Sequence, residues 1–191
     1  MSGLEWVSVN LSARHLHEDD VATWLEQTTR SAGIDPSQIV LEVTETAAMI
    51  DIDASIEKLS QLRQMGFGIA LDDFGTGYSS IAYLRRLPIS ILKIAQSFVT
   101  DLGNSGDETF VRAIIDLAHN LNLPVVAEGI ETQAQLDTIV GMGCDLAQGY
   151  LLGPPTALGA DYHPWPPPDR VSAPLPQIKR LIDWDSPVGV I

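Results

Sequence analysis

With 191 residues, of which 45% are apolar and 19% charged, the chain has the length and composition of one globular domain with a single core. Its formal net charge of −14 argues against binding along a nucleic-acid polymer or an anionic membrane, since both need basic surfaces. No run of about 18 apolar residues and no signal-peptide pattern is present, so we expect a soluble, cytoplasmic protein without a membrane span. The single cysteine, Cys144, excludes an internal disulfide.

Short β-branched runs alternate with helical stretches between Trp6 and Tyr150, which is typical of βα units around a parallel sheet. The predicted strands are Trp6–Asn10, Ile39–Thr44, Phe67–Asp72, Ile91–Ile94, Val125–Glu128 and Leu146–Tyr150. The predicted helices are Asp20–Ser31, Ala54–Met65, Ser79–Arg86, Glu108–Asn120 and Gln133–Val140. From Pro154 onward the chain is rich in proline, so we expect an irregular tail with at most a short helix at Ile178–Trp184.

The number of strands bears directly on the fold. A closed (β/α)₈ barrel needs eight strands and typically about 250 residues. The pattern predicts six strands in 191 residues. It therefore leaves two architectures open, an open parallel sheet and a barrel that lacks its first portion.

Polar residues recur where the predicted strands stop, and a parallel barrel gathers the carboxyl ends of its strands on the face that holds the active site. An acidic residue after a strand is often only the N-cap of the next helix. However, lysine is rarely buried without a partner, and Lys93 interrupts an apolar strand. We therefore interpret the recurring set as a functional site, and its members are Asn10, Glu42, Asp72, Asp73, Lys93, Glu128 and Gln148.

The segment Asp72–Ser80 joins two adjacent carboxylates to a loop that contains Gly75 and Gly77. Two neighbouring carboxylates can bridge or flank two divalent cations, an arrangement suited to in-line displacement at phosphorus. The glycines allow the backbone to approach a ligand closely. Alone, this pattern is a weak signal of a metal-dependent phosphodiesterase.

Further motifs flank this segment in a fixed order. They are Val9-Asn10-Leu11-Ser12-Ala13-Arg14, Leu41-Glu42-Val43-Thr44-Glu45-Thr46, Leu92-Lys93-Ile94 with Ser97-Phe98-Val99, Val126-Ala127-Glu128-Gly129-Ile130-Glu131-Thr132, and Gly143-Cys144-Asp145 with Gln148-Gly149-Tyr150. Together they resemble the motifs of the EAL family of cyclic di-GMP phosphodiesterases. The resemblance implies a TIM-type (β/α) barrel, here incomplete with about six of its eight strands. It also implies an EAL-type domain at residues 1–155, followed by a proline-rich tail at 156–191.

The resemblance assigns roles to individual residues. Mg²⁺ or Mn²⁺ at two sites is implied, and hard oxygen ligands suit these ions. Lys93 would orient the attacking water or stabilise charge near the scissile phosphate, and Glu128 would assist deprotonation of that water. Glu45 would hold the loop after Asp73, while Glu131 and Gln148 would support the pocket or touch the ligand. The implied metal ligands are Asn10, Glu42, Asp72, Asp73 and Glu128.

Two features of the sequence depart from the family pattern. The Glu-Ala-Leu strand that names the family would precede the asparagine motif, and this sequence begins after it, which removes one metal-ligating glutamate and two strands. We therefore expect one weakened metal site and an open barrel edge, covered by a second copy, by a partner, by the proline-rich tail or by swapped elements. The second departure is Ala95, where the family usually has an aspartate. Because residues two apart on a strand face the same way, we expect Ala95 to point toward the site with Lys93.

Two functions follow as hypotheses, and whether the chain is itself an enzyme stays open. The first is hydrolysis of cyclic di-GMP to the linear dinucleotide by a two-metal mechanism, with low activity for this chain alone. The second is a degenerate, non-catalytic module in signalling that binds cyclic di-GMP or a protein. Schiff-base chemistry on Lys93 is disfavoured, because the nearby acidic residues would keep its amine protonated.

Overall fold

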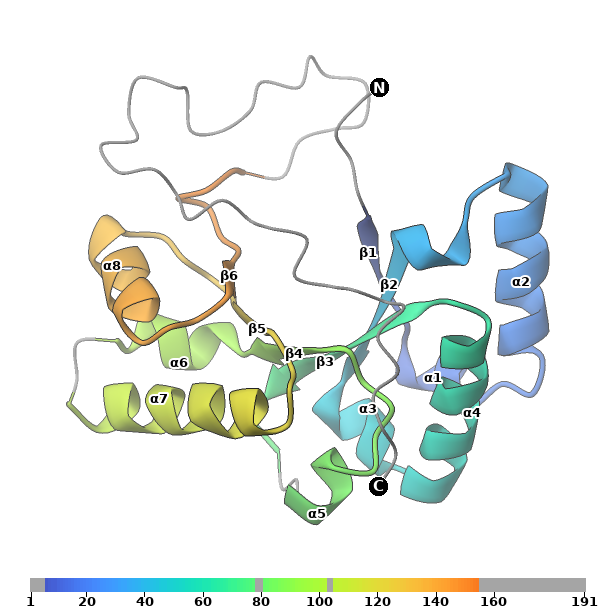
Figure 1. Ribbon diagram of the computed structural model, residues 1–191, viewed down its shortest axis with the longest axis horizontal. Helices are drawn as coiled ribbons and strands as arrows, with labels where there is room; N and C mark the ends of the chain where they lie inside the picture. The colour runs from blue at the N-terminus through green and yellow to red at the C-terminus, as the bar shows by residue number, and fades with distance from the viewer. Residues whose placement is uncertain (1–5, 78–80, 103–104, 155–191) are drawn as a thin grey trace. The chain divides into compact units, whose positions relative to one another are not determined.

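The computed structural model of the protein describes residues 6–77, 81–102 and 105–154 (Figure 1). Its six strands form a sheet in chain order, β1 to β6, and the pairs β1–β2, β2–β3 and β5–β6 are parallel. The strands are β1 Val7–Asn10, β2 Ile39–Thr44, β3 Gly68–Phe74, β4 Ile91–Ile94, β5 Val125–Ala127 and β6 Leu146–Ala147. The predicted α/β class with six strands is therefore confirmed, whereas the predicted tail and its short helix lie outside the described residues.

Helices follow the strands along the chain. They are α1 Ala13–Leu16, α2 Val21–Ala32, the 3₁₀ turn η1 Pro36–Gln38, α3 Glu45–Met49, α4 Ile52–Gln64, α5 Ile81–Leu84, α6 Gln96–Thr100, α7 Ser105–Asn120 and α8 Gln133–Gly141. Every predicted helix overlaps one of these. The sequence pattern missed α1, η1, α3 and α6, because elements of three to five residues are too short to show helical periodicity.

The chain divides into two compact units. The first contains Met1–Lys93 and Asn120–Leu123, and the second contains Ile94–His119 and Pro124–Ile191. The boundary falls within β4.

The first unit is built on β2 and β3, whose core positions are fully buried. Val40 and Val43 of β2 and Ile69 of β3 have no exposed surface, and Leu59 and Leu62 of α4 are equally buried. Burial of such side chains stabilises a fold by about 1.5–3 kcal/mol each. This core holds the carboxyl ends of β2 and β3 in a fixed relation.

The second unit has its core between α7 and β5. Val111, Ile115 and Ala118 of α7 are fully buried, as are Val125 and Ala127 of β5. These α7 positions recur at steps of four and three residues, the spacing of the buried face of a helix.

Strand β6 is shorter than predicted, since it ends at Ala147 rather than at Tyr150. A Cβ at Gly149 would overlap the backbone N and O of Ile130, so the chain here lies directly against the neighbouring segment. The amide of Leu152 then donates to the Gly149 carbonyl (3.0 Å) and closes a turn. Only glycine permits this close approach, and the turn replaces the last residues of the expected strand.

The sequence setting of Cys144 favours an inert buried thiol, and in the structure the residue is half-buried. Its Sγ lies 3.4 Å from the Val125 carbonyl oxygen and 3.3 Å from that of Leu146. Burial raises the pKa of the Cys144 thiol to about 12, so the reactive thiolate is scarce at neutral pH.

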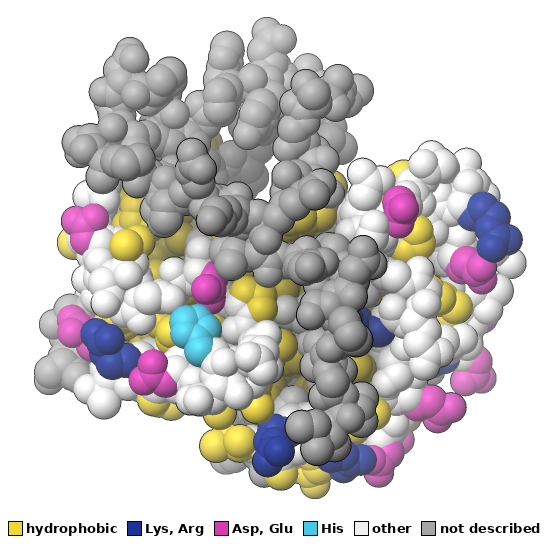
Figure 2. Space-filling view, in the orientation of Figure 1, with side chains coloured by type: hydrophobic (Ala, Val, Ile, Leu, Met, Phe, Trp, Pro, Cys, Tyr) yellow, Lys and Arg dark blue, Asp and Glu magenta, His cyan; other side chains and the backbone are white. Residues whose placement is uncertain are grey.

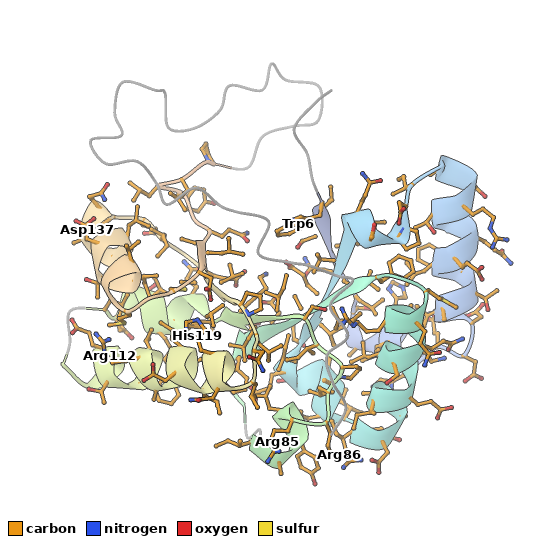
Figure 3. The ribbon with its side chains drawn as sticks, in the orientation of Figure 1. Trp6, Arg85, Arg86, Arg112, His119 and Asp137 are labelled. Atoms are coloured by element: carbon orange, nitrogen blue, oxygen red, sulfur yellow. The ribbon has the colours of Figure 1, made fainter. Side chains whose placement is uncertain are left out.

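On the face shown in Figure 2, the described acidic and basic side chains are spread among neutral ones rather than gathered in a basic stripe. This distribution agrees with the net charge of −14. Among residues 6–77, 81–102 and 105–154, no helix has the length and hydrophobicity required to cross a membrane.

Candidate functional site

Lys93 is a buried lysine that forms ion pairs with two carboxylates. Its Nζ lies 2.9 Å from Oε1 of Glu42 and 3.4 Å from Oδ1 of Asp72, and only 5% of its side chain is exposed. Glu42 stands on β2, Asp72 on β3 and Lys93 on β4. Three polar residues that are distant in sequence therefore meet at the strand ends, as expected. The two carboxylates offset the free-energy cost of removing the Lys93 ammonium group from water.

The register of the strands places Asn10 beside this cluster. Asn10 of β1 is the pairing partner of Glu42, and the Leu11 amide donates to the Glu42 carbonyl at 2.8 Å. Paired residues on parallel neighbours face the same side of a sheet. However, Asn10 is exposed, as is the whole of β1. Its predicted role as a metal ligand stays a prediction.

Asp73 has an unusual backbone conformation at the end of β3. Its φ of +55° lies in the left-handed region, which is uncommon for residues other than glycine. The Asp73 amide donates to Oδ1 of Asp72 at 2.9 Å, and one carboxylate oxygen of each residue lies within 4.8 Å of one from the other. Desolvation raises the pKa of the Asp73 carboxyl, the charge of Asp72 adds to the rise, and Lys93 opposes it. Two crowded carboxylates are a natural place for a cation.

The loop after Asp73 is fastened to Glu45, the first residue of α3. Glu45 is only 1% exposed, and its Oε2 accepts a hydrogen bond from the Gly75 amide at 2.8 Å. A Cβ at Gly77 would overlap Oε1 of Glu45, so this position needs glycine. Glu45 is itself placed by Thr44, which caps α3 by accepting from the Ala47 amide. The loop therefore has a defined anchor within the first unit.

In the second unit, Glu128 directly follows β5 and is half-buried. Its amide donates to the Ile94 carbonyl at 3.3 Å. Gln148 is exposed, and its amide donates to the Ala127 carbonyl at 2.8 Å, while Glu131 is exposed in the segment before α8. The catalytic and metal-binding roles implied for Glu128, and the supporting roles of Glu131 and Gln148, stay predictions.

Ala95 follows β4 directly and is buried, and its expected orientation toward the site with Lys93 stays a prediction. The strand ends at Ile94, and Ala95 turns the chain (φ −57°, ψ 142°) into the N-cap position of α6. An alanine offers no side-chain acceptor there, and the cap hydrogen bond is missing. Aspartate is among the best N-cap residues. An aspartate at this position would therefore cap α6. Its absence from this chain is only weak evidence that the site is inactive.

This geometry makes a prediction about stability. Replacing Ala95 by serine should raise the free energy of unfolding by about 0.5–2 kcal/mol, because the hydroxyl supplies the side-chain acceptor that the N-cap of α6 lacks. Chemical denaturation of the two proteins measures the change. A serine variant with unchanged or lower stability would count against the N-cap assignment.

Acidic residues, a buried lysine and a glycine loop at the ends of parallel strands define a candidate metal-dependent hydrolase site on an α/β fold. The EAL domain family matches residues 2–155 of this chain. The chain therefore belongs to the EAL domain family.

Individual relatives agree with this assignment. The chain is 46% identical over 153 residues to the bifunctional diguanylate cyclase/cyclic di-GMP phosphodiesterase MucR of Pseudomonas aeruginosa, covering 79% of this chain and 22% of MucR. It resembles the solved structure of the PaMucR phosphodiesterase in complex with c-di-GMP, with a TM-score of 0.78, 45% identity and coverage of 80% of this chain and 62% of that one. It also resembles the manganese/cy-diGMP complex of Klebsiella pneumoniae BlrP1 (TM-score 0.73, 32% identity, 78% and 39% coverage). The expected TIM-type architecture, with six of its strands present, is confirmed by these structural similarities.

The chain spans about a fifth of the length of the curated relative and less than two thirds of either solved chain. What those longer proteins do is therefore not automatically what this chain does.

Proposed function

We propose that this chain contains the site of a cyclic di-GMP phosphodiesterase that uses two divalent cations, and that its activity alone is low. The observation that supports this proposal most is Lys93, buried between Glu42 and Asp72 at family motif positions. The family relatives named as cyclic di-GMP phosphodiesterases give the substrate class.

The donor set fits Mg²⁺ or Mn²⁺, since it consists of carboxylate and amide oxygens. Asp72 and Asp73 would hold one ion together with Glu128, and Asn10, Glu42 and Asp72 would hold the other. Bound divalent cations supply Lewis-acid activation of the phosphate and of the attacking water.

The protein's own residues have separate tasks in this proposal. Lys93 keeps a fixed positive charge where negative charge grows on the phosphate oxygens. Glu128 takes the proton from the attacking water as its oxygen bonds to phosphorus. One P–O ester bond then breaks, the departing ribose oxygen takes a proton from solvent, and Glu128 releases the proton it accepted to solvent, which gives the linear dinucleotide.

Metal binding is the first property to test. We expect weak but measurable heat on titration of the protein with Mn²⁺, and its loss in Asp72→Ala, because Asp72 is implied in both ion sites. Asp20→Ala is the matched control, since Asp20 is exposed and makes no side-chain cap hydrogen bond. Calorimetry that cannot distinguish the protein from Asp72→Ala would refute the assignment.

One observation favours the alternative, a non-catalytic module that binds cyclic di-GMP or a protein. Glu42 is already neutralised by Lys93 at 2.9 Å, so an ion would have to compete for this carboxylate. Asn10, its neighbour in register, is exposed on an edge strand. Cyclic di-GMP binding without cleavage at saturating Mn²⁺ would support this alternative.

The exposed strand β1 suggests an assembly. Val7 and Val9 are each 45% exposed, and on a parallel edge strand such residues invite pairing with another chain. We propose that a second copy or a partner covers β1.

Light scattering tests this assembly. It should give a mass above the 20.7 kDa of one chain, and Val9→Lys should lower the measured mass. Val140→Lys is the control, at a valine on α8 that is 49% exposed, and it should leave the measured mass unchanged. A monodisperse monomer of the unchanged protein would contradict assembly through a second copy.

We propose in addition that residues 1–155 form the EAL-type domain and 156–191 a proline-rich tail. The family match over residues 2–155 supports this division. A cytoplasmic location is proposed because the single cysteine, a half-buried thiol, allows no internal disulfide.

A further inference from the structure

We propose that helix α6 positions the segment Glu128–Thr132 through two glutamine side chains. Gln96 belongs to α6 itself, and Gln135 belongs to α8 and is bonded to α6. Both are positioning residues, because they act on Glu128 and Glu131 through the backbone of that segment. The catalytic meaning of this inference rests on the proposed function, whereas its structural content does not.

Gln96, the first residue of α6, lies flat against Gly129. A Cβ added to Gly129 would overlap Cγ of Gln96, and it would lie 2.8 Å from Cδ and 2.9 Å from Cβ of that side chain. Gly129 has a φ of +72°, which favours glycine independently. The residue before it is Glu128, whose amide is bonded to the Ile94 carbonyl just before α6. Gln96 therefore covers the backbone next to Glu128 at the point where this segment leaves β5.

Gln135 ties the other end of the segment to the same helix. Its Oε1 accepts hydrogen bonds from the amides of Glu131 and Thr132, both at 2.9 Å. Its Nε2 donates to the Val99 carbonyl of α6 at 3.3 Å. One side chain therefore caps α8 and also links Glu131 to α6. Figure 1 shows α6 drawn between α8 and α7, and the contact of Phe98 with Phe110 fixes it on α7 (ring centroids 4.8 Å apart).

Backbone contacts hold the opposite side of the segment. The Ile130 amide donates to the Gln148 carbonyl at 3.0 Å, and Gly149 packs against the Ile130 backbone. Backbone contacts persist in most variants, whereas the contacts to α6 depend on the identity of two side chains. Gln96 and Gln135 are therefore the positions at which the placement of Glu128 and Glu131 can be altered without touching either acid. Small displacements of a reacting group lower a rate strongly, so these positions bear on catalysis.

Hydrogen exchange of the Glu128 and Ile130 amides tests the role of Gln96. In Gln96→Ala we expect exchange about tenfold faster, because the cover over Gly129 is lost and local opening becomes easier. Gln96→Met keeps an unbranched stem of similar length and should restore protection. Ser97→Ala, at the exposed neighbour on α6, is the matched control and should leave exchange unchanged. Unchanged exchange in Gln96→Ala, or equal acceleration in Ser97→Ala, would overturn the inference for Gln96.

Gln135→Glu separates the two tasks of Gln135. The carboxylate still accepts from the Glu131 and Thr132 amides, but it cannot donate to Val99. We expect these two amides to stay protected while the Glu128 and Ile130 amides exchange about tenfold faster. Ala134→Glu introduces the same charge at the exposed preceding residue, whose methyl group makes no hydrogen bond, and should have no such effect. The same exchange pattern in both variants would overturn the inference for Gln135.

These readouts do not depend on activity. If the exchange results are as expected and cyclic di-GMP is never cleaved, the positioning role stands and the proposed function fails. If the protein cleaves cyclic di-GMP, Gln96→Ala should lower kcat more than it raises KM, and Gln96→Met should recover most of the loss. Full activity in Gln96→Ala would show that the cover over Gly129 does not serve Glu128.

Discussion

Replacing Lys93 by alanine should lower the free energy of unfolding by about 3–5 kcal/mol. The substitution removes the ammonium group that lies 2.9 Å from Glu42 and 3.4 Å from Asp72. The buried Glu42 and the largely buried Asp72 then lose their counter-charge, and water cannot fully replace it. Urea denaturation of both proteins measures the difference, provided that no divalent cation is present to take the place of the lysine.

Two further variants make the interpretation specific. Lys58→Ala is the matched control, because Lys58 donates an exposed hydrogen bond to the Asp19 carbonyl at 3.0 Å. This substitution should lower the free energy of unfolding by less than about 1 kcal/mol. Adding Glu42→Gln to Lys93→Ala should recover part of the lost free energy of unfolding, since it removes one of the two carboxylates that have no counter-charge. Equal effects of Lys93→Ala and Lys58→Ala would show that the ion pairs do not stabilise the fold.

Placing a family Glu-Ala-Leu segment before Trp6 should raise hydrolysis of cyclic di-GMP by about 10–100-fold or more, the range in which even indirect ligand support alters metal sites. The resemblance implies that this segment supplies a metal-ligating glutamate. It would also pair with β1, whose residues are all exposed. In the proposed function, the addition would therefore supply a metal ligand and cover a sheet edge together.

The matched comparison is Ala95→Asp in the unmodified chain. Because Ala95 is the N-cap of α6, this substitution should mainly raise stability and should alter hydrolysis far less than the added segment. A variant Ala95→Asp that alone restored high activity would contradict this account of Ala95. It would place the missing carboxylate in the reaction itself.

The sheet was predictable because its strands carry a strong, local signal. Runs such as Ile39–Thr44 and Ile91–Ile94 are apolar and β-branched, and both are strands with the predicted bounds. The polar strand ends were also predictable as a group, and the structure brings Glu42, Asp72 and Lys93 together. The distances and partners of these ion pairs could not be predicted, because they depend on strand register and on burial.

Other features depend on contacts that no sequence window contains. Ala95 leaves β4 because α6 begins at Gln96, and a helix of five residues has no detectable period. Strand β6 stops early because Gly149 lies against Ile130, a neighbour that only the folded chain provides. The capping role of Gln135 could have been predicted from the sequence, since Thr132 and Gln135 have the spacing of a capping box. Its hydrogen bond to the Val99 carbonyl could not have been predicted.

The most direct test of the proposed function is chromatographic separation of cyclic di-GMP from the linear dinucleotide after incubation with the protein carrying the added segment. The account predicts slow conversion by the unmodified chain, faster conversion by the extended one, dependence on Mn²⁺ or Mg²⁺, and none in Glu128→Gln. An extended protein that binds cyclic di-GMP with Mn²⁺ present yet yields no linear product would contradict the enzyme assignment and leave the binding module.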